Sequence, residues 1–379
     1  MEASGQIGRH AAHGDHMHRA LALARRGLGR TAPNPMVGAV VVRGGRIVGE
    51  GYHHRAGQPH AEVLALRQAG PRARGATLYV TLEPCNHDGR TPPCCDAILA
   101  SGIARVVAAD RDPNPVTDGR GFARLRRSRV RLVTGVLARE ARDLNAPFHK
   151  AMRAGLPWVV AKIGQSVDGK IATRTGQSRW ITSAAARRLG HQWRSRVDAV
   201  LVGVNTVLQD DPRLSARAGR PPAGRPMKII VDSRLRTPVT ARCLSRQSPA
   251  PTLIATTVRP SARQRDAFAR RGAELLTLPA RRGRVPLRRL CRVLVKRGLQ
   301  SLLIEGGGEV LAGALAERLV DRVVWCIAPL IIGGRGAPSA VGGEGIPALA
   351  RAVRLADMRV SRLGPDLVVD ARVMYPGSR

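Results

Sequence analysis

The chain has 379 residues, of which 44% are hydrophobic and only 3% aromatic, so it is long enough for two or three domains with aliphatic cores. Its formal net charge of +36 is spread over the whole chain. Because aromatic side chains are scarce, this charge favours anionic small substrates and disfavours nucleic acid as a partner. Six cysteines form no disulfide scaffold, no apolar run reaches the ~18 residues of a membrane span and no signal peptide is recognisable, so we expect a cytoplasmic protein without a membrane partner.

The first part of the chain alternates strand and helix patterns after a polar start. Residues 1–14 are expected to form a flexible extension, followed by a helix over 15–26. Two strand patterns then flank the turn Gly44-Gly45. Two strands followed by alternating helices and strands predict a three-layer α/β domain over residues 15–150. The expected elements after residue 26 are strands 36–42 and 46–52, helix 60–70, strand 76–84, helix 92–102, strands 104–110 and 130–136, and helix 138–145.

Residues 145–158 lose this rhythm and are interpreted as a linker. Apolar strand patterns resume after it, with helical patterns between several of them. This order predicts a second α/β domain over residues 155–379, and no internal repeat relates it to the first. The expected strands are 158–166, 199–205, 227–233, 251–257, 273–278, 301–307, 322–331 and 367–373.

The stretch HAEVLAL, residues 60–66, opens an amphipathic helix with His60 and Glu62. Alone, these are ordinary polar residues of an exposed first turn. Downstream, however, a strand runs into Cys85, and Pro92-Pro93 precedes Cys94 at an expected helix start. One imidazole and two thiolates suit Zn²⁺, and three protein ligands leave a position for water, as in catalytic sites. We therefore predict a zinc site made of His60, Cys85 and Cys94.

Glu62 lies two residues after His60, so we expect it to contact the metal-bound water and to shuttle its proton. H-x-E followed by P-C-x-x-C is the signature of zinc nucleobase deaminases, but here eight residues separate Cys85 from Cys94. Cys95 competes with Cys94 as a ligand; we prefer Cys94 because it directly follows the two prolines, and interpret Cys95 as a packing residue. The remaining alternatives are buried free cysteines with a chance histidine, or a structural zinc.

The segments PNPMVGAVVV, PHAEVLAL, TLEPCNHDGRTPPCCDAI and DPNP resemble the deaminase half of the bacterial bifunctional riboflavin biosynthesis family. The resemblance implies a cytidine-deaminase-like fold, for which the longer cysteine spacing is normal, and it assigns zinc and the proton shuttle to the four residues above. It also implies a pocket for pyrimidine and ribose phosphate. Two of its residues have an alternative role. Asn34 stands between two prolines and is equally suited to a turn, and Arg90 is equally suited to a solvent-exposed position. The implied pocket residues are Asn34, His53, His87, Arg90 and Asn114.

In the second half, G-x-G-x-x-G after a first strand is absent, which argues against a Rossmann domain. The segments AKIGQSVDGKIAT, SRWITS, GVNTVLQDDPRLSAR, IVDS and IEGGG resemble the reductase half of the same family, which implies a dihydrofolate-reductase-like fold and NADPH. The implied cofactor residues are Gly164, Trp180, Thr206, Asp210, Ser233 and the loop Gly307, Gly308, Glu309, Val310, Leu311, Ala312 and Gly313. The implied substrate residues are Ser178, Arg194, Leu214, Arg217 and Glu305.

Particular roles follow for some of these residues. Arg194 and Arg217 suit a phosphate, although surface charge is the alternative in so basic a chain. Lys162 and Asp210 are candidates for positioning or protonating the reduced sugar, and Trp180 suits either the core or a place against nicotinamide. Gln165 stands where the family usually has alanine, so we expect it to crowd the cofactor. Residues 240–300 are arginine-rich and carry no recognisable motif.

The expected activity has two steps. Zinc hydroxide deaminates 2,5-diamino-6-ribosylamino-4(3H)-pyrimidinone 5′-phosphate, and NADPH then reduces the ribosyl group to give 5-amino-6-ribitylamino-uracil 5′-phosphate. Family members assemble, so a homo-oligomer is expected. One alternative is a nucleic acid or tRNA base deaminase, which predicts a short C-x-x-C loop and no cofactor site. Another is a non-catalytic, zinc-stabilised binding module, which predicts a fourth protein ligand.

Overall fold

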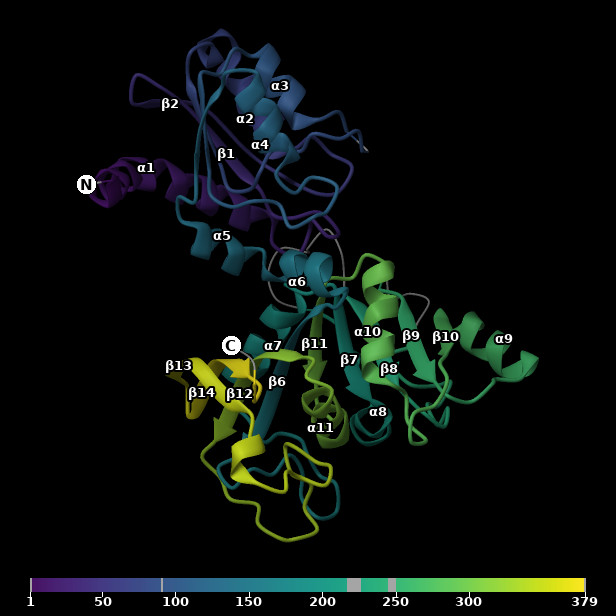
Figure 1. Cartoon of the computed structure of the whole chain (residues 1–379). Helices are drawn as coiled ribbons and strands as arrows, with labels where there is room; N and C mark the ends of the chain where they lie inside the picture. The colour runs from purple at the N-terminus through teal and green to yellow at the C-terminus, as the bar shows by residue number, and fades with distance from the viewer. Residues whose placement is uncertain (1, 90, 217–225, 245–249, 378–379) are drawn as a thin grey trace. The chain divides into compact units, whose positions relative to one another are not determined.

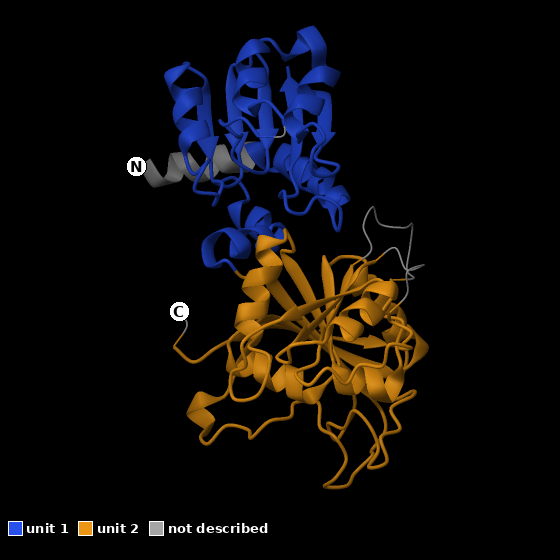
Figure 2. Ribbon diagram, turned by 90° about the vertical axis from the view of Figure 1, so that its right-hand side faces the viewer, with its two compact units in different colours: residues 1–155 blue, residues 156–379 orange. Residues whose placement is uncertain are grey.

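A computed structural model describes residues 2–89, 91–216, 226–244 and 250–377, with the backbone alone for residues 2–12. The chain divides into two compact units, Met1–Gly155 and Leu156–Arg379 (Figure 2). The helix predicted over residues 15–26 corresponds to α1 but begins earlier, at Glu2, so most of the extension predicted over residues 1–14 has a helical backbone. Each unit contains one sheet covered by helices, and each is described below by itself.

Unit 1 is built on a five-stranded sheet in the order β2-β1-β3-β4-β5. Figure 1 labels β1 and β2 of this sheet, together with the helices α1 to α6. The β1 strand pairs antiparallel with β2 and β3, whereas β3, β4 and β5 are parallel. The elements are α1 (Glu2–Ala24), η1 (Arg25–Gly27), β1 (Gly38–Arg43), β2 (Arg46–Tyr52), α2 (Ala61–Ala69), η2 (Gly70–Ala73), β3 (Thr77–Val80), α3 (Cys94–Ala100), β4 (Arg105–Ala108), α4 (Arg120–Arg127), β5 (Arg131–Thr134), α5 (Ala138–Leu144) and α6 (Ala146–Ala154).

Alternating side chains of this sheet supply two separate cores, one on each face. Val41 and Val80 pack with α2, α3 and α4, whereas Val40 and Val107 pack with α1 and α5. The helices therefore cover both faces, and the predicted three-layer α/β architecture is confirmed.

The linker predicted over residues 145–158 is wrong, because most of it forms α6. Pro147 lies in the first helical turn, where its missing N–H leaves no hydrogen bond unmade, and Gly155 ends the helix in a left-handed conformation. Phe148 and Ala151 are buried on one face. Because the helix is short and carries few apolar residues, its sequence shows no clear helical periodicity of apolar positions.

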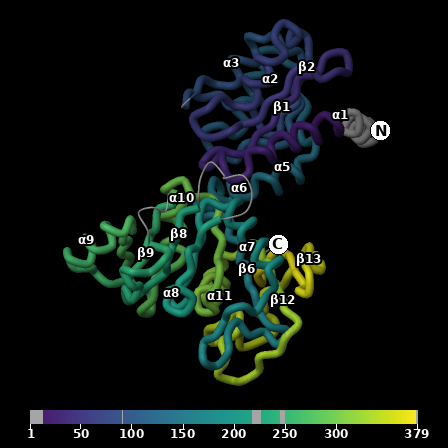
Figure 3. Tube along the Cα trace, turned by 180° about the vertical axis from the view of Figure 1, so that it is seen from behind, coloured from purple at the N-terminus to yellow at the C-terminus, as the bar shows by residue number. Residues whose placement is uncertain are grey.

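Unit 2 has a nine-stranded sheet in the order β10-β9-β8-β7-β11-β6-β12-β14-β13. The strands from β10 to β12 are parallel, and β14 and β13 extend the sheet antiparallel, with β13 at one edge (Figure 3). The elements are β6 (Trp158–Ser166), α7 (Ala184–Arg194), β7 (Ala199–Gly203), α8 (Val204–Asp210), β8 (Met227–Val231), β9 (Thr252–Thr256), α9 (Ala262–Arg270), β10 (Ala273–Thr277), α10 (Leu287–Lys296), β11 (Ser301–Glu305), α11 (Gly308–Ala316), β12 (Val320–Ala328), η3 (Leu349–Arg351), β13 (Arg354–Leu363) and β14 (Asp366–Met374).

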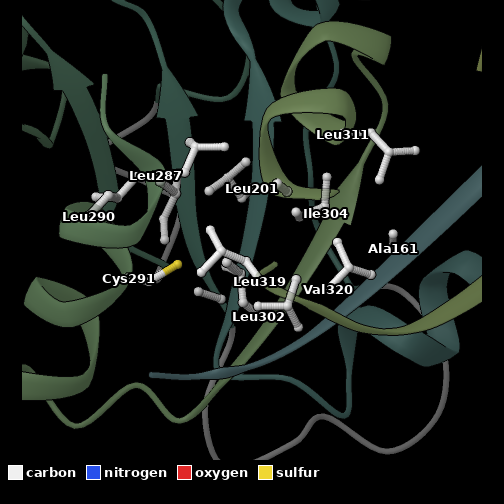
Figure 4. Close-up of a cluster of buried hydrophobic side chains, with 14 of the residues drawn as sticks. Ala161, Leu201, Leu287, Leu290, Cys291, Leu302, Ile304, Leu311, Leu319 and Val320 are labelled. Carbon is white, nitrogen blue, oxygen red and sulfur yellow. The ribbon is translucent and has the colours of Figure 1, made fainter. Parts of the chain in front are cut away.

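The core of unit 2 is aliphatic, as the composition predicts. On one face, side chains of α10 and α11 pack onto β7 and β11, with Leu290 and Leu311 against Leu201 and Ile304 (Figure 4). On the other face, Ala186 of α7 and Phe268 of α9 belong to the second core. Both faces of the parallel part are therefore covered, which leaves the ends of its strands for a binding site.

Candidate active sites

His60, Cys85 and Cys94 converge in unit 1, with their ligand atoms all within 4.8 Å of one another. His60 Nδ1 lies 3.1 Å from Cys94 Sγ and 3.6 Å from Cys85 Sγ. Ligands around one zinc ion lie roughly 3.3–3.8 Å apart, given its usual bond lengths. The other ring nitrogen of His60 lies 3.4 Å from Thr91 Oγ1, so Nδ1 is the atom that faces the sulfurs. The donor set and its spacing therefore fit zinc.

Three different elements bring these side chains together. His60 precedes α2, Cys85 follows β3, and Cys94 is the first residue of α3. The Cys94 N–H donates to Cys85 Sγ at 3.3 Å. The Cys94 thiol donates to the thiolate of Cys85 and, together with His60, lowers the pKa of Cys85 to about 4. A thiolate, the form that binds metal, is thus favoured at this position.

Cys95 lies in the core of unit 1 and not among the three converging residues. Its Sγ donates weakly to the carbonyl oxygen of Pro84 at 3.6 Å, and burial raises the pKa of its thiol to about 12. A thiol that stays protonated in an apolar layer packs rather than binds metal.

Glu62 is 3% exposed and hydrogen-bonds to Cys94 from the first turn of α2. Burial raises the pKa of its carboxyl to about 7. A carboxyl group with such a pKa holds and releases a proton near neutral pH, which is what a general acid and base requires. It lies beside the three metal-binding candidates without being one of them.

The side chains predicted to bind substrate in unit 1 form two groups. Asn34 Nδ2 lies 3.1 Å from His53 Nε2, and the His53 ring packs edge-on against His60 with 5.2 Å between centroids. The side-chain oxygen of Asn114 accepts a hydrogen bond from the backbone N–H of Val116. In the same turn, Thr117 Oγ1 lies 3.5 Å from His87 Nδ1. Arg90 lies outside the described residues.

Sequence reasoning missed Glu83, which is 3% exposed. Its carboxylate accepts hydrogen bonds from the backbone N–H groups of Asp112, Gly119 and Phe122 at 3.0–3.2 Å. Glu83 therefore holds the turn that contains Asn114 against the strand end that leads to Cys85. The available signal was an acidic residue at the end of an apolar strand and directly before Pro84-Cys85.

Two glycines of β2 allow α2 to lie directly on the sheet. A Cβ atom at Gly51 would lie 2.4 Å from the carbonyl oxygen of Ala61, and one at Gly49 would lie 2.2 Å from that of Ala65. Since real Cβ atoms do not approach backbone so closely, both positions require glycine. The short distance between α2 and the sheet, and with it the position of His60, depends on these two residues.

Unit 2 contains a cavity of about 2860 Å³ at the ends of β6, β7, β8 and β11. Every described residue that was predicted to bind cofactor or substrate in this unit lines it, whereas Arg217 lies outside the described residues. A crevice at the carboxyl ends of parallel strands is the usual ligand site of such a sheet. The residues concerned are Lys162, Gly164, Ser178, Trp180, Arg194, Thr206, Asp210, Leu214, Ser233, Glu305 and Gly307 to Gly313.

The glycine-rich turn after β11 lies along one side of the cavity. Gly306 and Gly307 have φ angles of 79° and 82°, which favour glycine. A Cβ atom at Gly308 would lie 2.6 Å from the carbonyl oxygen of Ser339. This turn leads directly into α11, so backbone N–H groups at its start are available to a phosphate. Leu311 belongs to the buried core (Figure 4).

Several predicted residues contact one another in this cavity. The Ser178 hydroxyl donates to Asp210, and Lys162 is in register with Glu305 on the adjacent strand. Trp180 is 68% exposed and stacks with Arg187 at 4.4 Å, so a role in the core is wrong for this side chain.

Gln165 does not crowd the cavity, contrary to expectation. Four consecutive residues of β6, from 161 to 164, line the cavity, whereas Gln165 does not. The Gln165 side chain instead accepts a hydrogen bond from the indole of Trp325 on β12.

Together, the two units define a zinc-binding deaminase joined to a reductase with a dinucleotide-sized cavity. Residues 11–110 match the cytidine and deoxycytidylate deaminase zinc-binding region, and residues 157–369 match the RibD C-terminal domain. The chain belongs to the RibD family of riboflavin biosynthesis proteins. It is thus a bifunctional deaminase and reductase, with a zinc-binding first domain and an NADPH-dependent second domain.

The similarity covers nearly the whole chain. The riboflavin biosynthesis protein RibD of Aquifex aeolicus is 43% identical over 94% of this chain and 97% of its own length. Acinetobacter baumannii RibD has a TM-score of 0.86 at 36% identity, covering 95% of this chain and 98% of that one. A diaminohydroxyphosphoribosylaminopyrimidine deaminase/5-amino-6-(5-phosphoribosylamino)uracil reductase of Thermotoga maritima has a TM-score of 0.82 at 33% identity, covering 97% and 100%. The predicted deaminase and reductase folds are confirmed.

In the described part of the chain, no helix is long and apolar enough to span a membrane.

Proposed function

We propose that unit 1 deaminates 2,5-diamino-6-ribosylamino-4(3H)-pyrimidinone 5′-phosphate and that unit 2 reduces the ribosyl group of the product to a ribityl group. The printed activity of the Thermotoga maritima relative, a deaminase and reductase of such phosphoribosylamino compounds, supports this pair of reactions. The observation that carries the proposal is the convergence of one imidazole, two thiols and one buried carboxyl.

In unit 1, His60, Cys85 and Cys94 hold zinc. When bound, the metal lowers the pKa of a coordinated water toward ~7 and so supplies a nucleophile at neutral pH. Glu62 takes the proton of the nucleophile and delivers it to the amino group that leaves as ammonia. Its pKa of about 7 supports both halves of this transfer.

The remaining polar residues of unit 1 bind and orient the substrate. Asn34 has both a donor and an acceptor for a base edge. His53, fixed between Asn34 and the ring of His60, holds the pyrimidine near the metal. His87 and Asn114, with Arg90 from the segment between the cysteines, bind the ribose phosphate.

In unit 2, the cavity binds NADPH along residues Gly307–Gly313, which comprise the end of the glycine turn and the start of α11. NADPH supplies the hydride, and the protein contributes orientation and a site from which water is excluded. Lys162 and Asp210 position the sugar and donate the proton that its ring oxygen gains. Further contacts to the cofactor come from Gly164, Trp180, Thr206 and Ser233, and contacts to the substrate from Ser178, Arg194, Leu214, Arg217 and Glu305.

The domain limits 15–150 and 155–379 complete the proposal, together with assembly into a homo-oligomer in the cytoplasm. The edge strand β13 supports assembly, because Leu355, Met358 and Val360 are 41–59% exposed on it. An unpaired edge with apolar side chains is suited to pairing with a second copy. Six free cysteines are consistent with a reducing compartment.

The test is ammonia release from the phosphoribosylamino pyrimidine, measured with zinc-replete protein and after treatment with a chelator. We expect release that is lost on chelation and restored by zinc. NADPH oxidation, followed by absorbance on the deaminated product, then tests unit 2. Zinc-replete protein with neither activity would contradict the proposal.

A further inference from the structure

The cavity of unit 2 has a basic turn, Arg281-Arg282-Gly283-Arg284, on its rim, and all four residues line it. This turn lies in the arginine-rich region that carries no recognisable motif. Its backbone is closed by two reciprocal hydrogen bonds between Arg281 and Arg284, at 2.9 and 3.0 Å. Arg282 and Gly283 both have positive φ angles, 50° and 70°. The turn is therefore a tight hairpin with a defined backbone, which we call the RRGR turn.

The RRGR turn is attached to two residues already assigned to the cofactor. The N–H of Val285, directly after the turn, donates to Ser233 Oγ at 3.1 Å. Arg284 Nη1 pairs with Glu309 Oε2 at 2.8 Å, and Glu309 lies in the first turn of α11. These contacts hold the turn between the end of β8 and the start of α11, directly after the glycine turn.

The charge of this rim is not balanced. Glu309 neutralises Arg284, but among the described residues no carboxylate lies within ion-pair distance of Arg281 or Arg282. Arg234, directly after Ser233, lines the same cavity. Backbone N–H groups of the glycine turn can accommodate the two bridging phosphates, so these additional guanidinium groups are left for a further anion. Guanidinium groups bind phosphate through two parallel hydrogen bonds.

NADPH differs from NADH only by a phosphate on the 2′ oxygen of the adenosine ribose. We propose that Arg281 and Arg282 bind this 2′-phosphate and thereby select NADPH over NADH. The inference rests on the proposed function of unit 2 and adds to it the residues that discriminate between the two dinucleotides. The position of the RRGR turn, beside Ser233 and beyond the glycine turn, is where the adenosine end of a dinucleotide lies if its pyrophosphate rests at the start of α11.

The test compares binding of 2′,5′-ADP and 5′-AMP, measured by isothermal titration calorimetry on the full chain. In the variant Arg281→Gln/Arg282→Gln, we expect the affinity for 2′,5′-ADP to fall by about tenfold or more, because charge-assisted hydrogen bonds are lost. The affinity for 5′-AMP should stay within about twofold, since this ligand lacks the 2′-phosphate. The preference for NADPH over NADH in kcat/KM should fall by a similar factor.

The matched control is Arg263→Gln/Arg270→Gln on α9, which removes two exposed arginines that do not line the cavity. It should retain the affinity for 2′,5′-ADP, which separates specific contact from the general effect of net charge. Equal losses for both ligands, or a similar loss in the control, would overturn the inference. Wild-type protein that binds neither NADPH nor 2′,5′-ADP would contradict the proposed function, whereas wild-type binding with an unaffected variant would overturn the role of the RRGR turn alone.

Discussion

Arg194 and Glu305 form an ion pair that joins α7 to the end of β11. Arg194 Nε and Nη2 both contact Glu305 Oε2, at 2.7 and 2.6 Å, and Nη1 donates to the carbonyl oxygen of Ser215 at 3.1 Å. The two side chains are only 20% and 10% exposed. The pair thus fixes two predicted substrate residues that lie 111 positions apart in the chain.

Removal of one partner should cost stability, because the other charge stays buried. For Arg194→Met we expect the free energy of unfolding of unit 2 to fall by about 3 kcal/mol, as measured by chemical denaturation. The double variant Arg194→Met/Glu305→Gln should recover part of this loss. The control is Arg297→Met, whose partner Glu274 is 55% exposed and whose loss should cost less than about 1 kcal/mol. Equal losses for Arg194→Met and Arg297→Met would show that the buried ion pair stabilises unit 2 no more than the exposed ion pair does.

Glu62→Gln should separate metal binding from proton transfer. The variant keeps all three metal-binding candidates, so we expect it to retain zinc in metal analysis. Without a group that can carry the proton, the deamination rate should fall by about 10²–10⁴-fold, whereas NADPH oxidation by unit 2 should be unchanged. Cys94→Ser serves as the contrasting variant, since it should lose zinc and deamination together. If Glu62→Gln deaminates at the wild-type rate, Glu62 is not the proton carrier.

Asp112 should make unit 1 less stable as the pH rises. Burial raises the pKa of this carboxyl to about 6, against an ordinary value of 3.8. Between these two values the folded state binds the proton that the unfolded state has lost, so the stabilising contribution is complete below about pH 4 and is lost as the pH passes 6. Asp112→Asn should therefore raise stability by about 3 kcal/mol at pH 7.5 and have little effect at pH 4. Thermal unfolding at both pH values measures this difference, and an effect of the same size at both would contradict the assignment.

Gln165→Ala should leave cofactor binding unchanged, because the side chain contacts Trp325 and not the cavity. We expect the KM for NADPH to stay within about twofold and the indole to lose one hydrogen bond, at a cost of about 1 kcal/mol of stability. Gly164→Ala is the comparison, since Gly164 does line the cavity. A marked fall in the KM for NADPH in Gln165→Ala would show that the Gln165 side chain does crowd the dinucleotide.

The zinc site was predictable because its residues stand at the ends of secondary-structure elements. His60, Cys85 and Cys94 each flank a helix or strand whose apolar pattern is clear, so the order of elements brings them together. Glu83 was not predictable in the same way. Its partners are backbone N–H groups of a distant turn. Because every residue except proline has such a group, the residue types of the turn do not indicate which carboxylate it binds.

Among the elements that escaped prediction, which include α4, two did so for a related reason. The edge strand β13 is exposed along almost its whole length and carries charged side chains on both faces, so no alternating pattern marks it. The α6 helix has a proline in its first turn and only nine residues. In both cases, pairing or packing with the rest of its own unit decides the structure, and local propensity does not.

The two glycines under α2 give the metal site a dependence that no inspection of its ligands would reveal. A single methyl group at Gly51 would push the helix outward by about 1 Å to relieve its contact with Ala61, and would carry His60 away from both sulfurs. A random mutagenesis screen for zinc-deficient protein would therefore recover codon 51 alongside the ligand codons, although the residue it encodes offers the ion no atom at all.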